Sequence, residues 1–319
     1  MQNRQYSQKT WCGIHIPVGH DAQIEALIAE LPTLADEGLN VLIPEVNYGF
    51  AYDSHPELRG DDPVTREKAH ALAAACHEHG VRLIPQFQCL GHQSWGRKTA
   101  PLLTVYPEFD ETPCEYPDNE DIYCRSWCPQ HPEINLIVFD LLDELLESFE
   151  ADALHVGMDE VFLIGSEHCP RCAGRNPAEL FAKAVNDYYS YLVQGRGVEM
   201  LMWGDRLLDA EATGYGKWEA AENDTHPAID LIPNDVIVCD WHYNTRETYP
   251  SIATFLEKGF RVWPAGWKDV EATEALLDAA LAHDDPHMLG YLCTTWGQVG
   301  PGELADWPPI RTAMQRMTA

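Results

Sequence analysis

The sequence predicts an α/β fold, a single (β/α)8 TIM barrel with a long loop after the third strand. Short apolar segments rich in β-branched residues alternate with segments of helical periodicity along all 319 residues, in eight strand–helix units. No Gly-rich phosphate-binding loop follows any predicted strand, which disfavours the competing open, doubly wound sheet. We therefore expect residues 1–319 to form one domain.

The first four units show a strand that is apolar on both faces, followed by an amphipathic helix, as buried parallel strands require. Gly38 and Gly80 close the first two helices, and Pro132 suits the first turn of the third. The expected strands are residues 11–17, 41–47, 81–88 and 153–160, and the expected helices are residues 24–39, 65–80, 132–149 and 177–193.

The last four units repeat the pattern, although the helix after the fifth strand is expected to be short or irregular. Polar side chains interrupt each apolar segment only near its carboxyl end. The expected strands are residues 199–205, 235–243, 261–267 and 288–296, and the expected helices are residues 251–259, 271–283 and 303–317.

Charge and hydropathy exclude several classes of partner. Acids outnumber bases 51 to 21, for a formal net charge of −30, so phosphate backbones and anionic membranes would be repelled. No segment approaches the roughly eighteen apolar residues of a membrane span. The start, MQNRQYSQKTWCGIHIP, lacks the apolar region of a secretory signal, which predicts a cytoplasmic protein and leaves secretion after trimming open.

Polar side chains and tryptophans collect at the carboxyl ends of the predicted strands. In a parallel barrel these ends share one face, where the loops build the functional site. The loop over residues 90–131 is also long enough to indicate a functional role. The residues concerned are Glu45, Asn47, Gln86, Gln88, His92, Trp95, Asp159, Glu160, Trp203, Asp205, Asp240, Trp241, His242, Tyr243, Trp263, Trp267, Trp296 and Gln298.

Two adjacent acids, Asp159 and Glu160, follow the fourth strand in ALHVGMDEVF. Neighbouring carboxylates repel and are costly to desolvate, so a purely structural strand would not place them there. Tryptophan rings stack on the flat C–H faces of a pyranose, while carboxylates, amides and histidines bind its hydroxyls. One or two tryptophans are most simply core residues, but tryptophans at the same end of five strands favour a sugar site.

Several segments resemble glycoside hydrolase family 20, the β-N-acetylhexosaminidases. HVGMDEV is similar to the family's His-x-Gly-Gly-Asp-Glu signature, and LIPQFQCLGH (residues 83–92) to its third-strand segment ending in Pro-Gly-His. MWGD (residues 202–205) and TTWGQ (residues 294–298) resemble its fifth- and eighth-strand tryptophan segments.

The resemblance implies a retaining exo-enzyme that releases terminal GlcNAc or GalNAc from glycans or glycoconjugates, without a cofactor. The substrate's own 2-acetamido oxygen attacks C1 in place of an enzyme nucleophile. Asp159 would stabilise the acetamido nitrogen, Glu160 would act as acid and then base, and Tyr243 would hydrogen-bond the acetamido carbonyl. An ionised Asp159 beside it would favour a protonated Glu160. The expected substrate contacts are His92, His155, Trp203, Asp205, Trp241, Trp296 and Gln298, with a structural hydrogen-bonding role equally open for His155.

Three positions depart from the family pattern. His15 and His20 stand where an arginine normally ends the first strand, Gln298 replaces a glutamate, and Met158 replaces a glycine. These changes leave open a catalytically impaired sugar-binding barrel. A metal-dependent hydrolase or isomerase is the other alternative, with ligands at His155, Asp159, Glu160 and His242.

Two cysteine pairs lie in the loops after the third and fourth strands, CRSWC and CPRC. Their spacing fits a structural zinc site of Cys124, Cys128, Cys169 and Cys172, with His168 as a substitute ligand. Disulfides and free thiols are the alternatives.

Overall fold

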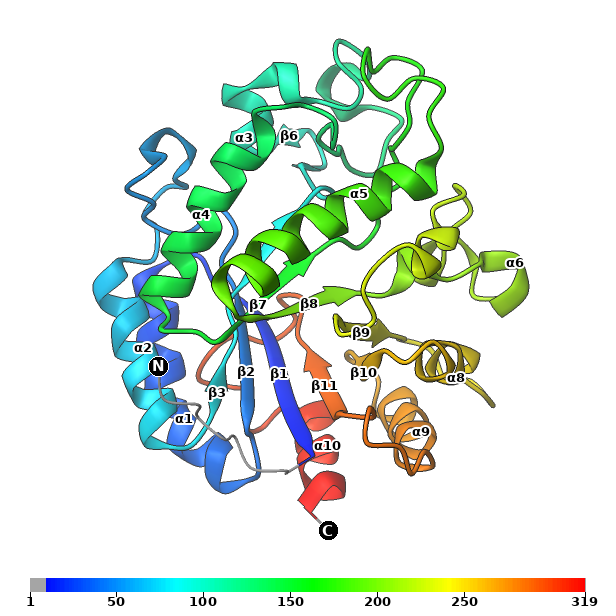
Figure 1. Ribbon diagram of the computed structural model, residues 1–319. Helices are drawn as coiled ribbons and strands as arrows, with labels where there is room; N and C mark the ends of the chain where they lie inside the picture. Colours follow the sequence, from blue (N-terminus) through cyan, green and yellow to red (C-terminus); the bar gives the residue numbers. More distant parts are fainter. Residues whose placement is uncertain (1–9, 319) are drawn as a thin grey trace.

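The computed structural model describes residues 10–318, whose parallel strands close into a barrel (Figure 1). The strand order is β1-β11-β10-β9-β8-β7-β4-β2-β3, and β1 also pairs with β2, which closes the circle. The predicted (β/α)8 fold is confirmed. The barrel strands are β1 (Trp11–Pro17), β2 (Val41–Glu45), β3 (Arg82–Leu83) with β4 (Gln86–Cys89), β7 (Ala153–Gly157), β8 (Glu199–Trp203), β9 (Ile237–Trp241), β10 (Arg261–Gly266) and β11 (Gly290–Thr294).

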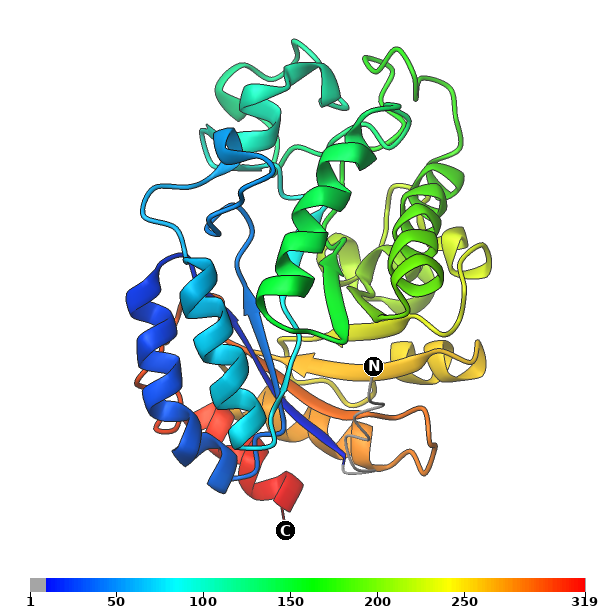
Figure 2. The same cartoon turned by 60° about the vertical axis from the view of Figure 1, so that its left-hand side comes forward.

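Helices surround the strands (Figures 1 and 2). Thr65, Asn176 and Asp269 accept hydrogen bonds from backbone N–H groups in the first turns of α2, α5 and α9, which fixes where these helices begin. As expected, only short helices follow β8. The helices are α1 (Asp21–Asp36), α2 (Arg66–Glu78), α4 (Ile134–Ser148), α5 (Pro177–Tyr189), α6 (Ala210–Thr213), α7 (Gly216–Glu219), α8 (Pro250–Glu257), α9 (Val270–Leu281) and α10 (Pro308–Thr318).

Some predicted boundaries are wrong. The fourth strand ends at Gly157, three residues early. The last helix begins at Pro308 rather than residue 303, because the Pro308–Pro309 pair suits a first helical turn but not a helix interior. Residues 190–196 continue α5 with a wider, π-helical turn.

Apolar side chains fill the barrel interior, as a closed parallel barrel requires. Trp263, expected at the carboxyl rim, lies deep in this interior instead, with its ring centroid 5.0 Å from that of Trp11 near the amino ends. Its register partner is Cys239, two residues before Trp241 in β9. The interior residues are Val41, Ile43, Ile84, Ala153, Leu201, Trp203, Ile237, Cys239, Trp241, Trp263, Ala265 and Leu292.

The loops that follow β4 and β7 both rise over the same end of the barrel (Figures 1 and 2). The β4 loop contains an antiparallel hairpin, β5 (Ser94–Trp95) and β6 (Lys98–Thr99), and a short helix, α3 (Pro101–Val105). Its length agrees with the predicted long loop. These two loops therefore cover the face that carries the polar residues.

Within residues 10–318, no helix combines the length and apolarity needed to cross a membrane. The first nine residues, on which the expectation about a secretory signal partly rests, lie outside the described part of the chain. The cytoplasmic location stays a prediction.

Candidate active site

Asp159 and Glu160 sit just beyond β7, where the backbone leaves the extended conformation. Adjacent residues of a strand point to opposite faces, so two neighbouring carboxylates could not converge within one. Gly157, Met158 and Glu160 adopt positive φ angles of 68°, 78° and 49°. This turn brings both acid side chains to the same place, and both are nearly buried, at 7% and 9% exposure.

His92 bridges the two acids. Its Nε2 atom lies 3.2 Å from Asp159 Oδ2 and 3.1 Å from Glu160 Oε2. Burial opposes the charged imidazolium, but Asp159 and Glu160 raise the pKa of His92 well above its ordinary value. His92, expected to bind substrate, therefore forms a cationic link between the two carboxylates.

Each of the two acidic residues also has a hydrogen-bond partner that the other lacks. Gln88 Nε2 donates to Asp159 Oδ1 at 2.6 Å, and the Glu160 backbone N–H donates to Asp205 Oδ2 at 2.9 Å. Burial raises the pKa of Asp159, but His92 and Gln88 bring it below its ordinary value, so this carboxylate is ionised. The two acids thus differ in their surroundings, as two different chemical roles require.

Asp205 is a positioning residue rather than the expected sugar contact. It is 2% exposed, and its oxygens are taken by Trp241 Nε1 at 3.2 Å, Arg206 Nε at 2.7 Å and the Glu160 N–H. Burial raises its pKa to about 6, although Arg206 acts in the opposite direction. Asp205 fixes the backbone of Glu160 and the indole of Trp241.

Aromatic side chains lie beside the acids on the same rim. Trp296 Nε1 donates to the Tyr243 hydroxyl at 2.6 Å, and the Tyr243 ring stacks on Trp241 with centroids 4.8 Å apart. Trp267 also contacts Tyr243, at 5.3 Å between centroids. Burial raises the pKa of Tyr243 well above its usual range, so its phenol stays protonated and can donate a hydrogen bond.

Two other side chains that were expected to contact substrate are inaccessible to it. Trp203 and His155 are fully buried, with their ring centroids 4.6 Å apart. His155 Nδ1 accepts the Gly157 N–H at 3.0 Å, which is the structural role left open for it. A sugar could touch neither side chain unless its neighbours moved. Gln298, by contrast, is exposed, in the turn after β11.

Tyr123, which the sequence analysis missed, hydrogen-bonds the Glu160 side chain. Burial and then Glu160 raise the pKa of this phenol, so it stays neutral. Its ring lies 6.0 Å from that of Trp95 and 4.9 Å from that of Trp218, and these two tryptophans are 70% and 42% exposed. A tyrosine in a long loop carries no sequence pattern that could have identified it.

At the end of β1, buried His15 lies where the family pattern has an arginine. Its Nε2 atom is 2.9 Å from Glu45 Oε2, and its ring lies 4.6 Å from that of Trp296. The β1 end therefore presents a histidine–carboxylate pair beside the aromatic group.

The predicted catalytic metal set is not assembled. His242 is held elsewhere, by Glu219 at 2.6 Å, Asp240 at 3.1 Å and Ser251 at 2.8 Å. Burial opposes the charge of His242, but Asp240 and Glu219 raise its pKa to about 9. In the described chain, the group of potential ligand atoms that includes the acid pair is His92, Asp159 and Glu160.

The predicted zinc site of four cysteines is wrong in one residue, Cys124. Cys124 Sγ points at the Glu160 carbonyl oxygen, 3.6 Å away, whereas Cys128, Cys169 and Cys172 lie together with Glu111. The loop places Cys124 on the active-site side, so Glu111 takes the fourth position. His168 faces Glu115 instead, at 3.4 Å.

Comparisons with known proteins identify the family of the chain. The profile of glycosyl hydrolase family 20, catalytic domain, matches residues 24–298. Beta-hexosaminidase A of Caenorhabditis briggsae is 22% identical over 343 residues, covering 93% of this chain and 58% of that protein. A beta-hexosaminidase of Akkermansia muciniphila is 28% identical over 116 residues, 34% of this chain and 21% of that protein.

Solved structures share the fold. The Flavobacterium johnsoniae chitobiase matches with a TM-score of 0.70 at 18% identity, over 97% of this chain and 48% of that one. A β-N-acetylhexosaminidase from Bacteroides fragilis matches with a TM-score of 0.66 at 16% identity, over 96% and 65%. The chain thus spans less than two thirds of each of these relatives. The family match over residues 24–298 shows that this chain belongs to glycosyl hydrolase family 20 and contains its catalytic domain.

Proposed function

We propose that the chain is a retaining exo-β-N-acetylhexosaminidase that acts through the 2-acetamido group of its substrate. The observation that carries the proposal is the pair of carboxylates that share His92 but differ in their other partners. One acid is ionised and fixed by Gln88, as the stabiliser of a developing positive charge must be. The other contacts a neutral phenol, Tyr123.

In the first step, the acetamido carbonyl oxygen attacks C1 and the glycosidic C1–O bond breaks. Glu160 gives its proton to the departing oxygen, while Asp159 stabilises the nitrogen, which becomes positive in the oxazolinium ion. In the second step, water attacks C1, Glu160 takes up the water's proton and the acetamido group re-forms. Tyr243 donates to the acetamido oxygen, and Trp296 with Trp241 packs around the sugar. These steps require no cofactor.

The substrates we propose are glycans or glycoconjugates that end in GlcNAc or GalNAc. Trp95, Tyr123 and Trp218 form an exposed aromatic group on the Glu160 side. A general acid faces the departing oxygen, so this aromatic group would receive the part of the substrate beyond the scissile bond.

The test is hydrolysis of aryl N-acetylglucosaminides and N-acetylgalactosaminides by the wild type and by Glu160→Gln. Turnover should fall by about 10²- to 10⁴-fold for poor leaving groups, and less for good ones that need no proton. Glu274→Gln, on the exposed face of α9, is the matched control and should keep full activity. Equal turnover of the wild type and Glu160→Gln would remove Glu160 from the mechanism.

A sugar-binding barrel without turnover is the second candidate, because buried His15 replaces the arginine at the end of β1. It would bind GlcNAc in a calorimeter yet hydrolyse neither glycoside at any pH. Dependence of turnover on an added divalent cation would instead favour metal chemistry at His92, Asp159 and Glu160.

A further inference from the structure

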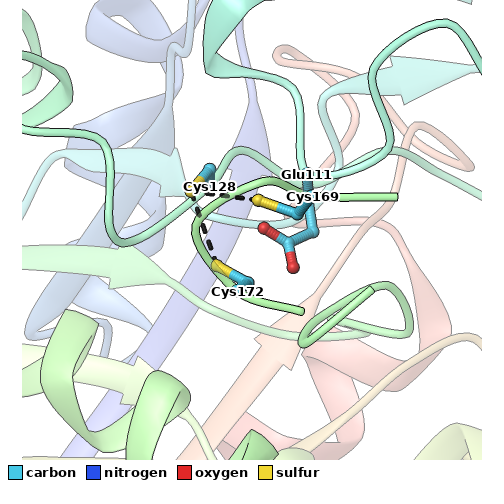
Figure 3. Close-up of side chains that lie close together, drawn as sticks. All are labelled: Glu111, Cys128, Cys169 and Cys172. Atoms are coloured by element: carbon cyan, nitrogen blue, oxygen red, sulfur yellow. Dashed lines mark hydrogen bonds between the residues drawn. The ribbon is translucent and has the colours of Figure 1, made fainter. Parts of the chain in front are cut away.

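Three sulfur atoms and one carboxylate lie close together (Figure 3), in a group separate from the one that contains the acid pair. Cys128 Sγ lies 3.4 Å from Cys169 Sγ and 3.5 Å from Cys172 Sγ, and the Glu111 carboxylate completes the group. The four potential ligand atoms all lie within 4.8 Å of one another. Glu111 and Cys128 come from the loop after β4, and Cys169 and Cys172 from the loop after β7.

Glu111 is unusual for a buried acid, because no cationic side chain is among its hydrogen-bond partners in the described chain. Its side chain is completely buried. Its Oε1 atom accepts the Ser166 N–H at 3.0 Å, and its other partners are the Gly165 N–H and the thiols of Cys169 and Cys172. A buried carboxylate with no cation beside it is costly, so a carboxylate that faces three sulfur atoms indicates a missing positive ligand.

Backbone contacts hold the cysteines in place for such a ligand. Cys128 and Cys169 each begin a Cys-Pro-x turn, and in each turn the N–H two residues later, of Gln130 or Arg171, donates to the sulfur. These N–H···S hydrogen bonds fix the positions of both sulfur atoms within the cluster. On the other side, the Glu111 N–H donates to the Ser126 carbonyl at 3.0 Å.

We propose that Glu111, Cys128, Cys169 and Cys172 bind a structural Zn²⁺ ion. A tetrahedral zinc with Zn–S bonds of about 2.3 Å separates its sulfur ligands by about 3.8 Å, close to the distances seen here. A disulfide would use two sulfurs and leave the third thiol and Glu111 without a cation. Thiolate-rich tetrahedral sites favour zinc over magnesium or calcium, and four protein ligands make the site structural rather than catalytic.

The ion would join the two loops that cover the active face. Cys128 lies five residues after Tyr123, which bonds Glu160, and four after Cys124, which contacts the Glu160 backbone. Zinc binding at one end of this segment would therefore restrict the motion of Tyr123. Each thiol that binds the ion releases its proton to solvent.

Metal content tests the proposal without reference to turnover. The full chain, purified under reducing conditions without chelator, should contain about one zinc ion by mass spectrometry of the metal. Cys128→Ser and Cys172→Ser should lower the zinc content to background. Cys114→Ser, at an exposed thiol of the same loop, should keep full zinc content. Cys124→Ser should also keep it, which separates this site from one that uses all four cysteines of the two short motifs.

Cobalt substitution gives a second readout if a variant folds poorly. Chelator-treated wild type refilled with Co²⁺ should show the visible bands of a tetrahedral site and thiolate charge-transfer absorption in the near ultraviolet. Glu111→Gln should shift the visible bands while the charge-transfer absorption stays, because only the oxygen ligand changes. Wild type that holds no zinc even after incubation with ZnCl₂ would overturn the proposal. A mass loss of two hydrogens that maps to a Cys128 disulfide would do the same.

Discussion

Replacing His92 with glutamine should move the acidic limb of the pH–rate profile to higher pH. The reaction proposed here needs Asp159 ionised, and His92 Nε2 lies 3.2 Å from its Oδ2 atom. The folded-state pKa of Asp159 is depressed by this neighbour, so activity is present above that pKa and is lost as pH falls through it. Glutamine keeps a hydrogen-bond donor but removes the positive charge.

The size of the shift follows from the separation of the charges. At 3.2 Å and an effective dielectric constant of about 20, the attraction is about 5 kcal/mol. The two groups give up part of this to desolvation, and carboxylates beside a cation show pKa decreases of about 1 to 3 units. We therefore expect the acidic limb of kcat/KM to rise by about 1 to 3 pH units in His92→Gln.

The assay is kcat/KM for an aryl N-acetylglucosaminide across the acidic range, with thermal unfolding measured at each pH. His70→Gln is the matched control, because His70 pairs with Glu150 at 3.7 Å on the exposed surface. Its profile should coincide with that of the wild type. A folded His92→Gln protein whose acidic limb has not moved would refute the electrostatic role given to His92.

Three further predictions concern stability and are measured by urea unfolding. Gly157→Ala should lower the unfolding free energy by about 3 kcal/mol, because Gly157 has a positive φ and a Cβ there would lie 2.2 Å from the buried Gln88 Oε1 atom. Gly174→Ala is the control: Gly174 also has a positive φ, but a Cβ there would meet open space, so the loss should be about 1 kcal/mol. Asp205→Ala should cost about 3 to 5 kcal/mol, because it leaves the Arg206 guanidinium buried without its carboxylate, and a loss below 1 kcal/mol would contradict this. Folding raises the pKa of His242 from 6.5 to about 9, so the charged imidazolium adds about 3 kcal/mol to the unfolding free energy. This contribution is complete below pH 6.5 and is lost as pH rises through 9, and His242→Gln should lack it.

The barrel could be predicted from the sequence because hydrophobic periodicity identifies buried strands and amphipathic helices directly. The sequence predicts a fourth strand that runs to residue 160, because VGMDEV has the pattern of a strand. The structure ends it at Gly157, and the reason is a backbone turn at Gly157, Met158 and Glu160 that periodicity does not describe. Met158 at positive φ is especially hard to foresee, since such angles are rare for residues other than glycine.

The sequence locates some residues of the site correctly but not others. Position at a strand end identified Asp159, Glu160 and Tyr243, whose chemical roles stay predictions. The same rule could not tell an exposed residue from one that is sealed beneath its neighbours, so Trp203 and Asp205 were expected to touch sugar. Spacing within the two cysteine motifs located the sulfur cluster but not the contribution of a glutamate that comes from earlier in the loop.

The groups that surround the acid pair come from different connections of the barrel, which has a consequence for engineering. Segments at and just after the ends of β9 and β11 supply Trp241, Tyr243 and Trp296, whereas the connection between β4 and α4 supplies His92, Trp95 and Tyr123. Grafting that connection from another member of the family would therefore change the aromatic side chains on the Glu160 side, provided that the graft keeps a histidine at position 92 to pair with both acids. Such a graft would succeed as a unit only if it carried matching partners for Cys169 and Cys172.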